Sequence, residues 1–412
     1  MKVNGIIAEY NPFHNGHQHH LEFAKERNHS DYTIIAMSGN FVQRGAPALL
    51  DKYSRAQMAL SCGADLVLEL PTCYSASSAE YFATGAVTLL DKLGVVTHLC
   101  FGSECGDNHV IRQIAEILLE EPEEYKKALQ SFLKQGQTYP SARTWALLQY
   151  DPSLSAYKDI LSMPNNILGI EYVKALMRRN SQIIPDTSLR VGSDYHDKRL
   201  GTNQSSALAI RQAIFFRQDF EFLESQMPGN AYHIMAESLK QAGYIHSDDF
   251  SHILLYKLLR ERAEGYTQYL DVSDELSDRI RNNLYHFGCF KNFCDLLKSK
   301  DMTYTRVSRC LLHILLDIKK ETLEHYKTLD HIPYARVLGF RKSATPLLSA
   351  IKEHSSIPLV TKLADADKQL SPSALTMLKD EIRMSDIYAS VAAIKTQQTM
   401  RNEYSTPIVI VE

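Results

Sequence analysis

The sequence lacks both a long apolar run and a cysteine framework. No segment approaches the roughly 20 consecutive apolar residues of a membrane-spanning helix, and the short run Val3–Ala8 leads straight into polar turn residues, unlike a signal peptide. The cysteines are odd in number, scattered among apolar neighbours and without a CxxC pair: Cys62, Cys73, Cys100, Cys105, Cys289, Cys294 and Cys310. We therefore expect no disulfide framework and no zinc ribbon, and we predict a cytoplasmic protein without membrane contact.

The sequence also lacks an excess of positive charge. Its formal net charge is −3, so the chain as a whole does not attract nucleic acid. An RNA partner would need cations that are gathered locally, and such clusters lie in the middle and C-terminal thirds: Arg178–Arg179, Arg279–Arg281, Lys291–Lys300, Arg306–Arg309, Lys319–Lys320 and Arg336–Lys342. For each cluster taken singly, a solvated helix face is the alternative interpretation.

Hydrophobic patterning predicts an α/β fold for the first part of the chain. Strand-like segments at residues 3–8, 32–37, 65–70 and 97–101 alternate with helical segments at 51–62 and 77–93. This alternation favours a parallel sheet that is covered by helices on both faces and binds ligands beyond the C-terminal strand ends. One rim should therefore hold Glu9–His17, Ser38–Asn40 and Gly102–Glu104.

The rest of the chain predicts further domains, since 412 residues of which 44% are hydrophobic can bury two or three cores. Residues 107–157 have the pattern of a helical insertion, followed by a strand near Leu189–Val191 and a helix at 205–216. Residues 220–330 have helical spacing throughout, and the last eighty residues mix helices with short strands at 333–338, 359–361 and 407–411. We predict a catalytic domain at 1–219, a helical domain at 220–330 and a small α/β portion at 331–412.

The motif His14-Asn15-Gly16-His17 follows the first strand and opens a predicted helix. Backbone N–H groups at a helix N-terminus attract phosphate, and imidazoles one turn apart can donate to α-phosphate oxygens while pyrophosphate is displaced. Gly16 lets the backbone approach a nucleotide closely. The motif therefore predicts adenylation chemistry. A metal site on His14, His17, His19 and His20 is the alternative, but no nearby carboxylate or cysteine completes it.

Three further segments have a binding and a structural interpretation. Ser206 to Arg211 follows the loop Gly201–Gln204, and its hydroxyl groups and arginine form either a second phosphate cradle or a capped helix with a surface ion pair. Asn165 and Asn166 follow Pro164 and either contact a base or ribose or cap a helix. Arg190 either faces phosphate or is structural. Arg341-Lys342-Ser343 invites comparison with the Lys-Ser loop of class I aminoacyl-tRNA synthetases, but it has little of that motif.

With these residues in place, the chain resembles the bacterial tRNA(Met) cytidine acetate ligase family, which is similar to the nucleotidyltransferases of the HUP (HIGH-signature, UspA, PP-ATPase) Rossmann-like α/β folds. The resemblance covers the first half of the chain. Its blocks are Gly5–His17, Met37–Gly45, Ala64–Pro71, Phe101–Glu104, Pro164–Tyr172 and Ser206–Arg211. The second half agrees only in length and helical character.

The resemblance implies a two-step reaction. Acetate attacks the α-phosphorus of ATP to give acetyl-adenylate and pyrophosphate, and the N4 amine of the wobble cytidine (position 34) of elongator tRNA(Met) then takes the acetyl group and releases AMP, forming N4-acetylcytidine. His14 and His17 would be the catalytic donors, and Mg²⁺ would screen the β,γ-phosphates. Basic helices after residue 270 would bind the tRNA, and no protein partner is implied.

The family pattern also implies the nucleotide-binding residues. These are Ile7, Ala8, Glu9, Tyr10, Asn11, Pro12, Phe13, His14, Asn15, Gly16, His17, Gln18, His19, His20, Gly102, Asn165, Arg190, Ser206 and Arg211. The chain departs from the pattern at Leu208, where adenylyltransferases usually have a threonine, which weakens the contribution of that loop.

Two rival functions remain at this point. One is an adenylyltransferase that acts on a small phosphate ester without RNA, although such an enzyme needs little beyond the α/β domain. The other is an RNA-binding or scaffold protein with a structural ATP, although a passive pocket has no need of paired histidines.

Overall fold

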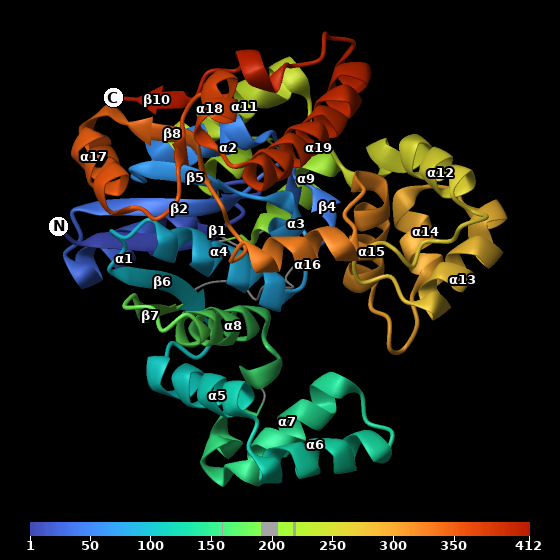
Figure 1. Cartoon of the computed structure of the whole chain (residues 1–412). Coiled ribbons are helices and arrows are strands. Elements are labelled where there is room, and N and C mark those ends of the chain that lie inside the picture. Colours follow the sequence, from blue (N-terminus) through green and yellow to red (C-terminus); the bar gives the residue numbers. More distant parts are fainter. Residues whose placement is uncertain (159, 191–204, 217–219) are drawn as a thin grey trace.

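A central sheet organises the computed structural model, which describes residues 1–158, 160–190, 205–216 and 220–412. Within these residues the sheet has eight strands in the order β10-β8-β5-β2-β1-β6-β7, with β9 paired to β8 (Figure 1). The N-terminal strands are β1 (Val3–Ala8), β2 (Tyr32–Ser38), β5 (Leu66–Leu70), β6 (His98–Ser103) and β7 (Ile184–Leu189). All of these neighbours pair in parallel, which confirms the α/β class.

Side chains that alternate along β2 build two separate cores. Ile34 and Ala36 pack into one core, whereas Ile35 and Met37 pack into the other. A strand points successive side chains to opposite faces, so a run that is apolar at every position indicates a sheet buried on both sides. Helices α1 (Asn15–Asn28) and α2 (Lys52–Ser61) cover one face, and α4 (Ala79–Lys92) and α8 (Pro164–Arg178) cover the other.

The strand order places a crevice at the C-terminal end of β1. The chain runs from β1 outward through β2 to β5, then returns to the other side of β1 to form β6 and β7. At such a reversal the connections diverge and leave room for a ligand outside the strand ends. Glu9, Ser38 and Gly102 lie at these ends, as the sequence predicts.

The C-terminal strands extend this same sheet. Strand β8 (Ala335–Arg341) pairs antiparallel with β5, and β9 (Leu359–Val360) and β10 (Val409–Val411) pair with β8. The sheet is therefore mixed at this edge, whereas its N-terminal strands are parallel as predicted. The short strands of residues 331–412 complete the N-terminal sheet, although the division of the chain into three domains stays a prediction.

Buried ion pairs join these distant segments. The Lys52 Nζ lies 2.7 Å from Glu69 Oε1 and 3.0 Å from Glu403 Oε2, and Arg336 Nη1 lies 2.8 Å from Glu69 Oε2. Arg336 also pairs with Glu403. All four residues are less than a tenth exposed. The cluster connects α2, β5, β8 and the turn after the last helix, so it fixes the C-terminal segment to the N-terminal sheet.

Two helical lobes project from the sheet layers (Figure 1). The insertion forms α5 (Asn108–Glu120), α6 (Glu123–Lys134), α7 (Tyr139–Tyr150) and the 3-10 helix η1 (Pro152–Tyr157). The second lobe is formed by α12 (Ser251–Arg260), α13 (Asp274–Asn283), α14 (Phe290–Leu297) and α15 (Tyr304–Leu316). Both confirm the helical character expected of residues 107–157 and 220–330.

The other described elements complete the two faces and the connections. They are β3 (Phe41–Val42), β4 (Ala46–Pro47), α3 (Thr72–Ser75), α9 (Ala207–Phe215), α10 (Phe220–Ser225), α11 (Gly229–Ala242), α16 (Lys320–Thr328), α17 (Thr345–His354), α18 (Ala366–Gln369) and α19 (Pro372–Thr396). Strand β7 ends at Leu189, earlier than expected, and Val191 and the loop Gly201–Gln204 lie outside the described residues. No helix in the described part has the length and apolarity to cross a membrane, and all seven cysteines are free thiols.

Candidate functional site

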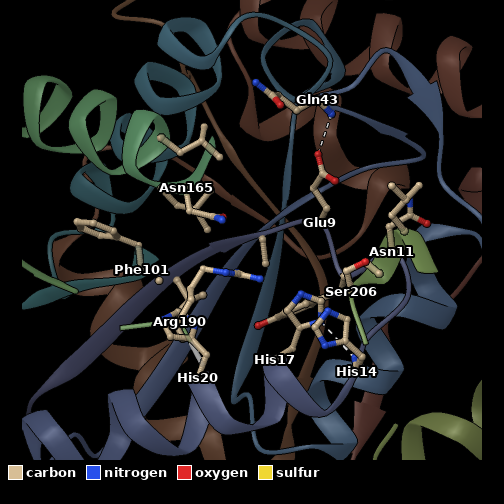
Figure 2. A pocket seen from close by; sticks show the side chains of 18 of the residues that line it. Glu9, Asn11, His14, His17, His20, Gln43, Phe101, Asn165, Arg190 and Ser206 are labelled. Atoms are coloured by element: carbon tan, nitrogen blue, oxygen red, sulfur yellow. Dashed lines mark hydrogen bonds between the residues drawn. The ribbon is translucent and has the colours of Figure 1, made fainter. Parts of the chain in front are cut away.

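A cavity lies beyond the C-terminal ends of β1 and β6, at the reversal of strand order (Figure 2). It brings together thirteen of the residues predicted from the sequence: Ile7, Ala8, Glu9, Tyr10, Asn11, His14, His17, His20, Gly102, Asn165, Arg190, Ser206 and Arg211. The other predicted residues do not line it: Pro12, Phe13, Asn15, Gly16, Gln18 and His19. Phe13 is fully buried and packs against the rings of Tyr10 and His17, and the His19 side chain is exposed.

His14 and His17 form a reciprocal cap at the start of α1. The His14 Nδ1 accepts a hydrogen bond from the Gly16 N–H at 3.1 Å, and the His17 Nδ1 accepts one from the His14 N–H at 3.2 Å. The two rings stack with centroids 3.7 Å apart. Because a neutral imidazole that accepts at Nδ1 holds its proton on Nε2, both rings keep an Nε2–H donor.

Gly16 is needed for this stacked arrangement. A Cβ atom at that position would lie 3.0 Å from His14 Cε1. A side chain would therefore crowd the imidazole that accepts from the Gly16 N–H. The glycine serves the histidine pair directly, which is a more local reason than the close approach of a nucleotide expected from the sequence.

The environment keeps these imidazoles neutral. Burial lowers the pKa of His14 to about 3, with a further contribution from Arg190 and Arg211. Burial also lowers the pKa of His17 well below its usual range and that of His20 to about 4. At neutral pH the site therefore presents uncharged N–H donors beside two guanidinium groups, which suits a polyanionic ligand.

The depressed pKa of His14 predicts a pH dependence of stability. The unfolded chain binds a proton at this residue below about pH 6.5, whereas the folded chain does so only near pH 3. The free energy of unfolding should therefore fall as the pH is lowered from neutrality toward about 4. Urea unfolding across this range should show a smaller pH slope for His14→Gln than for the wild type. An equal slope in both proteins would contradict the assignment.

Buried contacts hold the turn that follows β1. The Arg55 guanidinium is fully buried and donates to the backbone oxygens of Glu9 at 2.6 Å and Ser38 at 3.1 Å, so one side chain ties the ends of β1 and β2 together. The Asn11 Oδ1 accepts from the Leu49 N–H at 2.8 Å. The turn is thus rigid before any ligand binds, and a prearranged site loses less entropy on binding.

The first turn of α8 forms the opposite wall of the cavity. The Glu104 carboxylate accepts from the Asn165 Nδ2 at 2.6 Å and from the Asn166 N–H at 2.8 Å, while the Asn166 Oδ1 accepts from the Glu104 N–H at 2.9 Å. Asn166 is buried in this structural role, whereas Asn165 lines the cavity. Gly102 lies under Arg190, where a Cβ atom would be 3.1 Å from Arg190 Cγ.

Ser206 and Arg211 have structural contacts and also line the cavity. The Ser206 Oγ accepts from the Ala209 N–H at 3.2 Å as the N-cap of α9, and the Arg211 Nη1 donates to the Asn11 backbone oxygen at 2.6 Å. The structure thus supports the capping interpretation for Ser206. Both residues nevertheless remain in the cavity wall, where they could contact a ligand. Leu208, the departure from the family pattern, also lines the cavity.

Some residues of the cavity have no individual signal in the sequence. Gln43 and Arg44 reach it from the β3–β4 hairpin, and the Gln43 N–H donates to Glu9 Oε1 at 2.9 Å (Figure 2). The only available signal was the Met37–Gly45 block as a whole. An apolar part of the wall is formed by Phe82, Phe101, Leu168 and Tyr172. No group of three or more His, Cys, Asp or Glu residues in the described chain could hold a metal ion.

The segment Arg341-Lys342-Ser343 lies at the end of the sheet opposite the cavity. The Arg341 N–H donates at 2.9 Å to the backbone oxygen of Asp65, which precedes the first residue of β5. The segment therefore sits at the N-terminal ends of the parallel strands, opposite the cavity. It cannot act as a Lys-Ser loop on a ligand bound there.

Comparisons with known proteins agree with this geometry. The family model described as HIGH Nucleotidyl Transferase matches residues 1–403. A tRNA(Met) cytidine acetate ligase of Acetivibrio thermocellus is 40% identical over all of both chains, and one of Clostridium acetobutylicum is 44% identical over 88% of this chain and 90% of the relative. Crystal structures of Thermotoga maritima TmcAL, apo and bound with alpha-thio ATP, superpose with TM-scores of 0.93 and 0.91 at 32% identity over the whole of each chain.

Proposed function

Because this chain belongs to the HIGH nucleotidyltransferase family and, within it, to the tRNA(Met) cytidine acetate ligases, we propose that it activates acetate with ATP and acetylates N4 of the wobble cytidine of elongator tRNA(Met). The stacked His14–His17 pair carries this proposal. Its two Nε2–H donors belong to a helix N-terminus that opens into the cavity, where phosphate is favoured by the helix dipole.

The charges of the cavity wall support an adenylation step. Three arginines, Arg44, Arg190 and Arg211, line the cavity, and Glu9 is the sole carboxylate among its described lining residues. In the proposed step an acetate oxygen forms a bond to the α-phosphorus of ATP and the bond to pyrophosphate breaks. His14 and His17 donate to the α-phosphate oxygens, whose negative charge grows in the transition state. Neutral imidazole N–H groups suit this role because they stabilise the growing charge by hydrogen bonds, without transferring a proton to the phosphate.

The second proposed step transfers the acetyl group. The N4 amine attacks the acetyl carbon, the bond to the AMP oxygen breaks, and the amine loses a proton. Free acetate resists this attack because oxide is a very poor leaving group, whereas AMP leaves readily. An anticodon-loop base is unpaired and can be splayed out to reach the cavity. We assign catalysis to residues 1–219, and a tRNA acceptor would place the protein in the cytoplasm.

We also propose that magnesium enters with the nucleotide. Mg²⁺ prefers phosphate oxygens and water over an all-protein cage, and the described residues that line this cavity include a single carboxylate. Bound to the β,γ-phosphates, the ion would neutralise the charge of the leaving pyrophosphate. The protein would contribute the positioning of ATP through the turn after β1, the first turn of α8 and the start of α9.

An exchange experiment tests the proposal. Acetate should drive ATP–pyrophosphate exchange in the absence of RNA, and labelled acetate should then appear on tRNA(Met) that carries cytidine at position 34. A tRNA altered at that position should stay unlabelled. Exchange that requires a phosphate ester in place of acetate would favour the adenylyltransferase, and nucleotide binding without any exchange would favour a structural ATP.

A further inference from the structure

An exposed aromatic ring with a stacked cation lies on the inserted lobe. Trp145 is the only tryptophan of the chain, it is 39% exposed on α7, and the Lys158 Nζ lies 4.0 Å from the centroid of its ring. Gln149 is exposed one turn further along α7. The ring packs in part toward Phe132, with the two ring centroids 6.5 Å apart, while its exposed part and the cation held over its face leave a positively charged aromatic surface open to solvent.

The topology connects this surface to the cavity. The inserted lobe follows β6, whose Gly102 lines the cavity, and it ends before α8, whose first turn includes Asn165, another residue that lines the cavity. Figure 1 shows α6 and α7 projecting beyond α8. A base that enters the cavity would therefore leave the neighbouring part of its RNA close to the origin of this lobe.

Cations without a carboxylate at ion-pair distance occur on both helical lobes of the described chain. Residues 107–160 include six basic and eight acidic side chains, and residues 220–330 include fourteen basic and seventeen acidic ones. In the described part of residues 220–330, five of the fourteen cations pair with carboxylates, among them Lys257 with Glu261 and Arg279 with Glu275. On the inserted lobe, Lys127, Lys134 and Arg143 have no carboxylate at ion-pair distance within the described chain.

We propose that Trp145 and Lys158 form a stacking platform for unpaired nucleotides of the tRNA substrate, an inference that rests on the proposed function. Single-stranded RNA is bound by aromatic rings on which bases stack and by cations that contact the backbone. The inserted lobe supplies both, and its two ends lead to the wall of the cavity in which the acceptor base would react. The basic helices after residue 270, predicted from the sequence as the tRNA surface, are the alternative site that the control variant below tests.

The single tryptophan makes the platform directly observable. Intrinsic fluorescence of the full-length protein should be quenched, to saturation, by an RNA stem–loop with an unpaired loop. A fully paired RNA of equal length should produce little quenching. Anisotropy of the labelled stem–loop should show that Trp145→Ala weakens its binding about tenfold, the effect of losing one stacked base. Trp145→Phe should retain most of the affinity, and Lys158→Ala should weaken it less than Trp145→Ala.

A matched control lies on the second lobe. Tyr285 is 78% exposed, and the Arg262 guanidinium lies 4.9 Å from its ring, so Tyr285→Ala removes the same kind of pair from the other surface. It should leave stem–loop affinity unchanged. Affinity that falls with Tyr285→Ala and not with Trp145→Ala would overturn the proposal in favour of the second lobe. A change in the mass of the RNA-free protein with Trp145→Ala, at unchanged RNA affinity, would instead identify a contact between two copies.

The exchange assay separates this inference from the proposed function. Acetate-dependent ATP–pyrophosphate exchange without RNA should be the same in Trp145→Ala and in the wild type, since Trp145 lies outside the cavity. If stem–loop binding depends on Trp145 but the protein shows no acetate-dependent exchange, the platform is supported and the proposed ligase activity is rejected. Normal exchange with stem–loop binding indifferent to Trp145 would reject the platform alone.

Discussion

Replacing either His14 or His17 with alanine should lower kcat for acetate-dependent ATP–pyrophosphate exchange by about 100- to 1000-fold, while the dissociation constant for ATP changes little. Removal of one preorganised donor to a developing oxyanion costs about this much because the charge exists only in the transition state. The two imidazoles are buried, neutral and fixed by backbone hydrogen bonds, so no reorganisation is needed during the reaction. Steady-state exchange and ATP binding by calorimetry measure the two quantities separately.

Controls distinguish catalysis from helix capping. His14→Ala also removes an N-cap acceptor, which by itself costs about 1 kcal/mol of stability. His14→Asn restores a capping oxygen without an imidazole Nε2–H, so it should recover thermal stability and remain slow. His19→Ala changes an exposed histidine on the same helix and should leave kcat unchanged. A normal kcat in both His14→Ala and His17→Ala would remove the histidine pair from the mechanism.

Replacing Lys52 with methionine should lower the free energy of unfolding by about 3–5 kcal/mol. Lys52 is fully buried, with its ammonium group between the carboxylates of Glu69 and Glu403 and 2.9 Å from Ser385 Oγ. Methionine keeps much of the volume of the side chain but leaves Arg336 as the only cation, among the described residues, in contact with both carboxylates. Breaking a buried ion pair costs this much because one charge stays uncompensated in a medium of low polarity.

An exposed ion pair provides the comparison for Lys52. Lys342 pairs with Glu412 at the surface, where both side chains are more than half exposed, and Lys342→Met should cost less than about 1 kcal/mol. Urea unfolding of the three proteins at neutral pH measures the difference. Equal stability of Lys52→Met and the wild type would show that the buried cluster does not hold the C-terminal segment on the sheet. If adding Glu69→Gln to Lys52→Met restores the free energy of unfolding, the uncompensated carboxylate is the cause of the loss.

The N-terminal α/β pattern could be predicted closely because its signals are local. Strand β1 has the bounds predicted from the sequence, since a short apolar run that stops at turn residues already indicates a buried parallel strand. The β3–β4 hairpin was missed, because strands of two residues have no periodicity to detect. With it, Gln43 and Arg44 were missed as individual residues of the cavity.

Contacts between distant segments could not be predicted in this way. The pairing of β8 with β5 brings together residues about 270 positions apart, and only side-chain burial and backbone hydrogen bonds of the folded chain select that partner. The ion-pair partners of a basic cluster could not be predicted for the same reason. Arg178 and Arg179 form a basic pair in the sequence, but in the structure they bind Glu80, Asp91 and Asp330.

By itself, the sequence determined that a strand delivers His14-Asn15-Gly16-His17 to a helix N-terminus, and that this helix belongs to an α/β domain resembling one ligase family. These features depend on neighbouring residues and on their spacing. Only the tertiary structure decided that both imidazoles are neutral Nε2–H donors, because that state depends on burial and on the backbone groups that approach Nδ1. It also decided which cations are in ion pairs, because their carboxylate partners are often distant in sequence and approach only in the folded chain.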